Sequence, residues 1–362
     1  MSDNGESITE AGPAFRASED EVAQDWNALA DHLARHGLRL DRDVTPRQFA
    51  GGFGNLNYLI SVDGEPAVLR RPPMGPIPVG ANDMKREHTI LSRLWSALPL
   101  APRSIHYCPD EEVLGAHFLI MEYRPGLVIR GELPPGLQGN AQLAREIGER
   151  LVDTLVAIHS VDAHAIGLGD FGRPEGFVSR NIEGWARRAM DAGDGSPDTA
   201  VSALIDWLRR EQVPDQAPVL LHNDFKLDNL VLDPDSLKPR GILDWDMGSR
   251  GDPLVDLATL LSYWTEKDDP QAMHDLAQMP TAGDGFPDRG EVVGHYARAT
   301  GVDVSHIRFY RVLAMFKLAI VFRQLHQRYL TAGTTDSRYA RFGALSEGIL
   351  DFTHEIAMGR AF

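Results

Sequence analysis

The chain changes character near Gly126, and this change limits the fold more than any other feature. Before Gly126, short strand-like runs alternate with glycine and proline turns and with two helical stripes. After it, apolar residues recur mostly at helical spacing, except in one β-rich segment at residues 219–246. The contrast predicts an α+β chain with two lobes, one small and β-rich and one larger and mainly helical.

The elements expected before this change follow a definite order. A helix begins at Ser18, which can cap it together with Glu21, and ends before Gly37. Asp63-Gly64 joins two strand-like runs, which indicates a hairpin. In chain order we expect a helix at 18–36, a strand at 48–50, a glycine-rich loop at 51–55, a hairpin at 56–71, a helix at 83–98 and strands at 104–108 and 117–122.

These patterns divide the chain into three segments. Residues 1–17 are small, polar and acidic, so we expect a disordered tail. Residues 18–123 form the small lobe with its N-terminal helix, and residues 124–362 form the large lobe. Within the large lobe, the apolar run at 312–322 is expected to be core.

The charge balance and composition exclude several classes of protein. The chain carries 52 Asp and Glu against 36 Lys and Arg, and its net charge of −16 repels nucleic-acid backbones. Its single cysteine, Cys108, excludes an intrachain disulfide and a multi-cysteine zinc site, and no histidine spacing suggests zinc. The sequence shows no signal peptide and no membrane-spanning run. We expect a cytoplasmic protein that binds neither nucleic acid nor membrane.

The most specific motif, HNDFKLDN at residues 222–229, is followed by an LDWD segment. Asp224 precedes the amide of Asn229 by five positions, and a further acid, Asp244, ends a strand-like run. Phosphoryl transfer to a hydroxyl needs such a set, because one carboxylate orients or accepts the proton while carboxylate and amide oxygens hold Mg²⁺. Lys226 is placed to neutralise charge on the transferred phosphate.

A glycine-rich loop precedes the hairpin. Gly51, Gly52 and Gly54 offer the bare N–H groups and close backbone approach that a nucleotide phosphate requires. A strand rather than a helix follows the loop, which argues against a Rossmann dinucleotide site. Taken alone, the loop is equally well a tight turn.

Together these segments resemble the aminoglycoside phosphotransferase family of small-molecule kinases, which has a bilobal protein-kinase-like fold. The matching segments read GGFGNLNYLI, AVLRRPP, LIMEYRPG, LVAIHSVD, LLHNDFKLDNLVL and GILDWDMGSRGDPLVDLA. Two of them, AVLRRPP and LIMEYRPG, most resemble the branch found as the kinase domain of acyl-CoA dehydrogenase fusion proteins. The resemblance begins near Pro46 and covers most of the chain.

The resemblance implies a role for each matching residue. Asp224 and Lys226 would be catalytic, and Asn229 and Asp244 would bind Mg²⁺. The other implied positions are the phosphate-covering loop of Gly51, Gly52, Gly54 and Asn55, the nucleotide-binding hinge of Glu122, Tyr123 and Arg124, and the structural supports His222, Asp246 and Asp256. Arg70, which replaces the usual lysine, would pair with Glu87 and a phosphate. From the residues alone, Asp256 is equally well a plain helix residue.

We expect a phosphotransferase that uses ATP or GTP with Mg²⁺ to phosphorylate a hydroxyl of a small molecule. The resemblance favours a hydroxyacyl-CoA-like acceptor and implies a functional link to an acyl-CoA dehydrogenase, while the acidic charge also permits an aminoglycoside-like compound. Two alternatives stay open. One is a pseudokinase or regulatory module that binds nucleotide without transfer, which Arg70 supports. The other, with weaker support, is a metal-dependent phosphohydrolase that uses His222 and Asp224 as ligands.

Overall fold

The structure is a computed structural model that describes residues 13–50, 54–73, 82–192, 198–332 and 337–362. Contacts within the chain define two compact units. Unit 1 comprises Met1–Val128, Ala163–Gly169 and Asn229–Gly248, and unit 2 comprises Ile129–Asp162, Asp170–Asp228 and Ser249–Phe362. The chain therefore passes between the units more than once.

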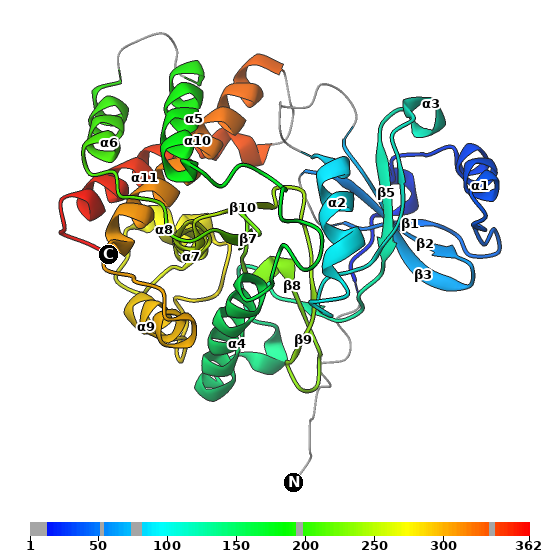
Figure 1. Ribbon diagram of the computed structural model, residues 1–362, viewed down its shortest axis with the longest axis horizontal. Coiled ribbons are helices and arrows are strands. Elements are labelled where there is room, and N and C mark those ends of the chain that lie inside the picture. The colour runs from blue at the N-terminus through cyan, green and yellow to red at the C-terminus, as the bar shows by residue number, and fades with distance from the viewer. Residues whose placement is uncertain (1–12, 51–53, 74–81, 193–197, 333–336) are drawn as a thin grey trace. The chain divides into compact units, whose positions relative to one another are not determined.

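A five-stranded antiparallel sheet of order β1-β2-β3-β5-β4 forms the centre of unit 1 (Figure 1). Its strands are β1 (Arg47–Gln48), β2 (Leu56–Val62), β3 (Glu65–Arg71), β4 (Ser104–Cys108) and β5 (Phe118–Glu122). The predicted hairpin joins β2 to β3. Its turn residues Asp63 and Gly64 have φ of 56° and 86°, the positive values that a two-residue hairpin turn requires.

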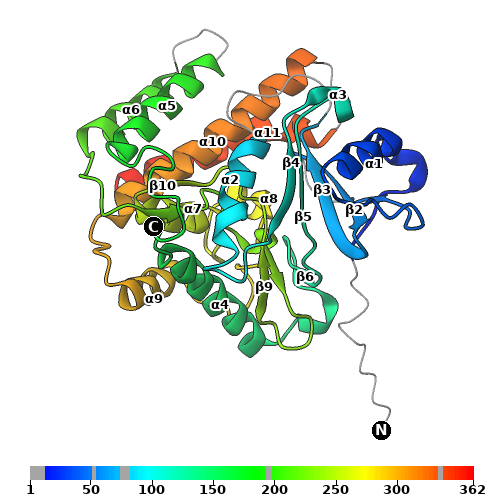
Figure 2. The ribbon, with the colours of Figure 1, turned by 45° about the vertical axis from the view of Figure 1, so that its right-hand side comes forward.

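Helices cover both faces of this sheet. Side chains alternate between the faces along β3, so Leu69 and Arg70 point in opposite directions. Leu69 packs with Leu29 and Leu33 of α1 (Trp26–Arg35), whereas Arg70 contacts Glu87 of α2 (Met84–Leu94). Figures 1 and 2 show α1 and α2 on opposite sides of the strands. A short helix, α3 (Glu111–Leu114), precedes β5.

The N-terminal region differs from the prediction. Ser18–Asp20 is a short 3-10 helix, and α1 begins only at Trp26, capped by Asp25, whose side chain accepts the N–H of Ala28 at 2.8 Å. Part of the predicted disordered tail is ordered, because Phe15 forms a β-bridge with Phe49 and stacks on its ring. Residues 1–12 of that tail lie outside the described residues.

A second, three-stranded sheet also belongs to unit 1. It contains β6 (Leu127–Val128), β8 (Leu230–Leu232) and β9 (Pro239–Ile242), in the order β6-β8-β9. The predicted division at residue 123 placed all of 124–362 in one lobe. Instead, the antiparallel pairing of β8 with β6 returns residues 229–248 to unit 1.

Unit 2 is mainly helical, as Figure 2 shows. Its helices are α4 (Ala141–His159), α5 (Phe177–Asp191), α6 (Thr199–Arg210), α7 (Pro253–Tyr263), α8 (Gln271–Leu276), α9 (Arg289–Thr300), α10 (Ile307–Ala332) and α11 (Phe342–Ala357). β7 (Val219–Leu221) and β10 (Ser249–Gly251) form a two-stranded sheet. α10 packs against α5, α6, α7 and α11, and the predicted core run at 312–322 is buried apart from partly buried Lys317 and Val321. Within the described ranges, no helix is both long and apolar enough to cross a bilayer.

Candidate active site

Arg70 is the centre of a charged cluster in unit 1. Its Nε lies 2.8 Å from Oε2 of Glu87 on α2. The same guanidinium contacts Oδ1 of Asp244, and its Nη2 lies 3.5 Å from Oδ2 of Asp246. Arg70 and Glu87 are both buried. The pair expected from the sequence is therefore present, and two further carboxylates join it.

This cluster contains more acids than bases. Burial raises the pKa of Glu87 to about 8, because loss of water outweighs the attraction of Arg70, and Asp246 and Asp244 add to the rise. Burial acts to lower the pKa of Arg70, but Asp244, Glu87 and Asp246 together raise it, so the guanidinium stays charged.

The β8–β9 hairpin places both predicted Mg²⁺ ligands at one end of the small sheet. Asn229 directly precedes β8, and Asp244 follows the last residue of β9 by two positions. Since the strands are antiparallel, these two ends coincide. The N–H of Leu243 donates to the carbonyl of Asn229 at 2.8 Å. Asp244 has a φ of 68°, in the left-handed region that non-glycine residues rarely adopt and that is common at functional sites.

Neighbouring residues fix the segment that carries Asp244. The N–H of Trp245 donates to Oε1 of Glu87 at 3.2 Å, and the Trp245 side chain is fully buried. Nδ2 of Asn55 donates to Oδ2 of Asp246 at 3.3 Å. Asp246 thus links the predicted metal-binding segment to the start of β2 within unit 1.

The structure describes one end of the predicted glycine loop. Gly51 and Gly52 lie outside the described residues, whereas Gly54 and Asn55 lie within them. Nδ2 of Asn82 donates to the carbonyl of Gly54 and to Oδ1 of Asn55, the latter at 2.9 Å. A Cβ added at Gly54 would lie 3.3 Å from the same Nδ2, a tight contact. Asn82, which the sequence analysis missed, therefore holds this end of the loop.

The predicted hinge from Glu122 to Arg124 already makes bonds within unit 1. The N–H of Glu122 donates to the carbonyl of Arg103 at 2.9 Å, and that of Tyr123 donates to Pro66 at 3.4 Å. Nη2 of Arg124 lies 3.0 Å from Oε2 of Glu122. The N–H groups of Glu122 and Tyr123 are therefore engaged within unit 1.

Asp224 belongs to a second charged cluster, in unit 2. Nζ of Lys226 lies 2.5 Å from Oδ2 of Asp224 and 3.5 Å from Oδ1 of Asp228. The hydroxyl of Tyr263 donates to Oδ1 of Asp224 at 3.0 Å. The sequence analysis placed Lys226 against a transferred phosphate, whereas in the structure its ammonium group is paired with Asp224. A buried ammonium takes the nearest carboxylate, because an unpaired buried charge is costly.

Both donors to Asp224 keep their protons. Burial acts to lower the pKa of Lys226, but Asp224, Tyr263 and Asp228 raise it well above its ordinary value. Burial raises the pKa of Tyr263, and the adjacent Asp224 carboxylate raises it further. Each oxygen of Asp224 therefore accepts a bond from a protonated neighbour.

Asp256 on α7 holds the loop that carries Asp224. Its Oδ2 accepts the N–H of His222 and its Oδ1 accepts the N–H of Asn223, both at 2.6 Å. The ring of His159 lies 3.2 Å from Oδ2. Burial acts to raise the pKa of Asp256, but its bonds with His159 and the charges of His159 and His222 lower it. Asp256 thus binds the loop backbone as a carboxylate, and it is not a plain helix residue.

His222 is buried beside this loop. Its ring packs edge-on against Phe225, with centroids 5.8 Å apart. Nδ1 of His222 accepts the N–H of Asp224 at 3.4 Å, a long bond. These contacts place His222 among the residues that support the loop.

Sequence reasoning missed Tyr263 and Lys317. Tyr263 lies seven positions after Asp256, so both side chains project from one side of α7, and this spacing was a usable signal. Nζ of Lys317 donates to the carbonyl of Asn223 at 2.9 Å, and burial lowers the pKa of Lys317. Within the sequence Lys317 is visible only as one charge in an apolar run, so its partner could not be predicted.

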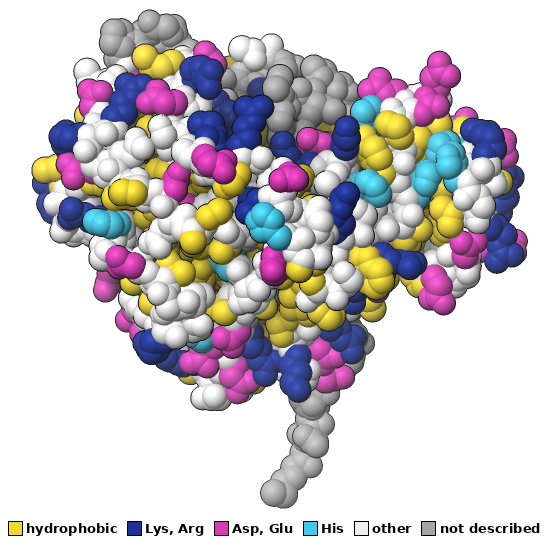
Figure 3. Space-filling view, in the orientation of Figure 1, with side chains coloured by type: hydrophobic (Ala, Val, Ile, Leu, Met, Phe, Trp, Pro, Cys, Tyr) yellow, Lys and Arg dark blue, Asp and Glu magenta, His cyan; other side chains and the backbone are white. Residues whose placement is uncertain are grey.

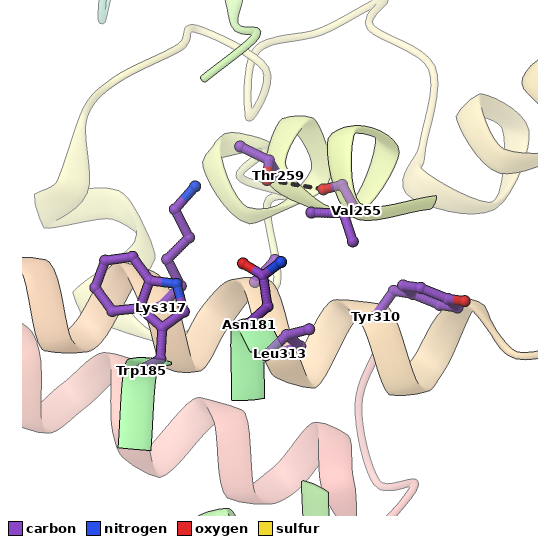
Figure 4. A pocket seen from close by; sticks show the side chains of 8 residues that line it. Asn181, Trp185, Val255, Thr259, Tyr310, Leu313 and Lys317 are labelled. Atoms are coloured by element: carbon purple, nitrogen blue, oxygen red, sulfur yellow. Dashed lines mark hydrogen bonds between the residues drawn. The ribbon is translucent and has the colours of Figure 1, made fainter. Parts of the chain in front are cut away.

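A small hollow lies beside Lys317. Figure 4 shows Lys317 extending from α10 toward α7, with Asn181 and Trp185 projecting from α5. Thr259 lines the hollow as well and bonds the carbonyl of Val255 at 2.8 Å. Its cavity volume is about 10 Å³, roughly the space that one water molecule needs and far below the roughly 300–1,000 Å³ of small-molecule sites. It is smaller than an acceptor site of ordinary size.

Proteins with a related sequence are considerably longer than this chain. The chain is 28% identical over 317 residues to mouse acyl-CoA dehydrogenase family member 10, covering 87% of this chain and 29% of that protein. It is 30% identical over 307 residues to rat acyl-CoA dehydrogenase family member 11, covering 83% of this chain and 39% of that protein. The chain thus spans well under half of the length of these relatives.

Solved structures and a family profile agree on the fold. A Ralstonia eutropha protein, provisionally named an aminoglycoside phosphotransferase, is 25% identical, with a TM-score of 0.74 over 93% of this chain and 99% of its own. Aminoglycoside phosphotransferase APH(4)-Ia, solved with ADP and hygromycin B, shares the fold at 15% identity and a TM-score of 0.58, over 91% and 97% of the two chains. The fold is that of these protein-kinase-like phosphotransferases. Residues 45–292 match the profile of the phosphotransferase enzyme family, and the chain belongs to that family.

Proposed function

We propose that this chain uses ATP or GTP with Mg²⁺ to phosphorylate a hydroxyl group of a small molecule. One observation carries the proposal. Asp224 sits on a loop that Asp256 holds by two backbone bonds, and it faces the proton donors Lys226 and Tyr263. A carboxylate fixed in this way can orient an alcohol and accept its proton as the oxygen attacks a phosphoryl group.

The charged cluster of unit 1 supports nucleotide binding. Asn229 and Asp244 would hold Mg²⁺, and Arg70 would contact a phosphate while Glu87 fixes its guanidinium. When bound, Mg²⁺ supplies positive charge to the β- and γ-phosphates. The excess of carboxyl groups around Arg70 fits such an ion. Asp224 and Asn229 are five residues apart, which limits their separation to about 17 Å of extended chain.

The residues near Asp224 have separate parts in the proposed reaction. Asp224 orients the hydroxyl of the acceptor and takes its proton. Lys226 balances the negative charge of this carboxylate, and the Tyr263 hydroxyl fixes its orientation. Asp256 and Lys317 act indirectly by positioning the loop, since both bind the loop backbone rather than Asp224 itself.

The named relatives suggest the acceptor. Proteins that contain a similar segment are called acyl-CoA dehydrogenases, which supports a hydroxyacyl-CoA-like acceptor and a functional link to such a dehydrogenase. The structure that contains hygromycin B supports an aminoglycoside-like acceptor instead. The first relationship has the higher sequence identity, 28–30% against 15%, so we favour the acyl thioester.

The test is ADP release by the purified protein with ATP, Mg²⁺ and a panel of hydroxyacyl-CoA compounds and aminoglycosides. We expect one acceptor class to stimulate ADP release, and Asp224→Asn to lower kcat by about 10²–10⁴, the range for general acid–base groups. Asp235→Asn is a matched control, because Asp235 is exposed on the turn between β8 and β9. Equal rates for wild type and Asp224→Asn would refute the assignment.

A second candidate is a module that binds nucleotide without transferring phosphate. The contact of the Arg70 guanidinium with Asp244 favours it, since it engages a carboxylate that Mg²⁺ would need. ATP binding without ADP formation for every acceptor would support this candidate.

A metal-dependent phosphohydrolase has less support. Among the described residues, no group of three or more potential metal ligands includes His222 or Asp224.

A further inference from the structure

Three histidines meet on unit 1, away from Arg70 and its carboxylates. His32 and His36 lie one helical turn apart at the C-terminal end of α1, and His106 lies on the edge strand β4. Their ring centroids are 4.4 Å, 5.0 Å and 4.9 Å apart, so the rings form a nearly equilateral triangle. In Figure 3, histidine side chains (cyan) gather on the surface beside α1.

The nitrogen atoms of the three rings converge. Nε2 of His32 lies 2.9 Å from Nε2 of His106, and one ring nitrogen of each histidine lies within 4.8 Å of the others. Two nitrogen ligands of a tetrahedral Zn²⁺ ion are about 3.3 Å apart, given Zn–N bonds of about 2.0–2.1 Å. His32 is buried, whereas His36 is exposed and able to turn toward the other two rings. A small rotation of His36 would therefore complete the set.

A hydrogen bond to the backbone leaves the Nε2 lone pair of His36 available to a metal. Nδ1 of His36 lies 2.9 Å from the carbonyl oxygen of His32. A carbonyl only accepts, so Nδ1 carries the proton and the neutral ring offers the lone pair of Nε2. Histidines that bind metals usually donate their other N–H in this manner, which fixes the tautomer and the orientation of the ring.

We propose that His32, His36 and His106 bind a divalent transition-metal ion, with zinc as the ion that best suits three imidazoles. Imidazole nitrogen is a ligand for zinc, copper and nickel, and three protein ligands leave a fourth position for water. The ion would join the end of α1 to the edge strand of the sheet. It would thereby stabilise unit 1.

No zinc site is predicted from the histidine spacing of the sequence, and the proposed site departs from that prediction. His32 and His36 form a pair at i and i+4 on a helix, which is a metal-compatible spacing. The third histidine is 70 residues further along, counted from 36 to 106. Only the packing of α1 near β4 brings it into reach.

The test uses untagged, metal-free protein titrated with Zn²⁺ by calorimetry and with Co²⁺ by visible absorption. We expect one ion per chain, the intense absorption of tetrahedral Co²⁺, and a higher Tm with Zn²⁺. His36→Gln and His106→Gln should each weaken binding by about 100-fold or more, since loss of even an outer partner costs roughly 10–100-fold. His117→Gln, a partly exposed histidine of the same unit, should bind like wild type.

If His106→Gln does not fold, His36→Gln still tests the site. His36 is exposed, so its replacement should leave the fold intact. Wild-type protein that gives neither the Co²⁺ absorption nor a Tm shift overturns the proposal. Unchanged affinity in His36→Gln overturns it as well. Phosphotransferase activity does not enter these readouts, so their failure is distinct from failure of the proposed function.

Discussion

Each of the two charged clusters pairs one buried cation with carboxylates, but the carboxylates come from different parts of the chain. In unit 1, the Arg70 guanidinium meets Glu87, Asp244 and Asp246, which come from a helix and from a distant hairpin. In unit 2, the Lys226 ammonium meets Asp224 and Asp228, which lie within two residues of it on one loop. A planar guanidinium can bond several carboxylates from different directions, whereas an ammonium is a compact point charge.

This difference indicates what each cluster contributes. The Arg70 cluster links three segments of chain, so it should matter for the stability of unit 1. The Asp224 cluster is local, and its position depends on the backbone bonds that Asp256 supplies. Changes in the first cluster should therefore appear mainly in unfolding, and changes in the second mainly in turnover.

The largest effect on stability is expected for Arg70→Met. The change leaves the buried acids without their cation, and loss of one partner of a buried pair costs about 3–5 kcal/mol. We expect the unfolding midpoint in urea to fall strongly. Arg93→Met, at an exposed position on α2, should have little effect. The combination with Glu87→Gln should recover part of the loss, and no recovery would contradict a direct pairing.

Asp256→Asn should lower both the stability of the chain and its turnover. The two N–H groups bind different oxygens of Asp256, and the amide keeps only one of these as an acceptor. Hydrogen bonds to a charged group contribute about 1.5–3 kcal/mol. We expect a loss of stability of that order together with a fall in kcat, because the loop of Asp224 loses its support. Asp206→Asn, exposed on α6, is the control. A stability loss with unchanged kcat would show that the loop keeps its position without Asp256.

Glu87 gives the Arg70 cluster a pH dependence. Its pKa of about 8 in the folded chain is above the ordinary 4.5, so the folded state binds this proton more tightly. The resulting stability is complete below about pH 4.5 and declines as the pH rises through 8, by at most about 1.4 kcal/mol per pH unit. Glu87→Gln resembles the protonated acid and should remove this decline. Parallel stability curves for both proteins would contradict the raised pKa.

Tyr263→Phe should have the smallest effect of the set. It removes one hydrogen bond to Asp224 without removing the ring, a change of about 0.5–1.5 kcal/mol. In steady-state assays we expect kcat to fall by about two- to tenfold, while the unfolding midpoint changes little. A fall as large as that of Asp224→Asn would instead place Tyr263 among the reacting groups.

Local patterns predicted the parts of the fold that depend on local physics. The β2–β3 hairpin follows from Asp63-Gly64, because this signal lies within two residues. The role that the HNDFKLDN motif gives Asp224 stays a prediction. The start of α1 was wrong, since Asp25 caps it while Ser18 begins a 3-10 turn. Long-range packing determines three other features. These are the return of β8 and β9 to unit 1, the bond of Lys317 to Asn223, and the approach of His106 to the other two histidines. No spacing in the sequence encodes those contacts.

The most direct test of the account is the effect of Mg²⁺ on the affinity for ATP, measured by calorimetry in wild type, Asp224→Asn and Asp244→Asn. If Asp244 holds the ion while Asp224 serves the acceptor, Mg²⁺ should tighten ATP binding in wild type and in Asp224→Asn. The enhancement should be lost in Asp244→Asn. Full enhancement in Asp244→Asn, or its absence in wild type, would contradict the assignment of these two carboxylates.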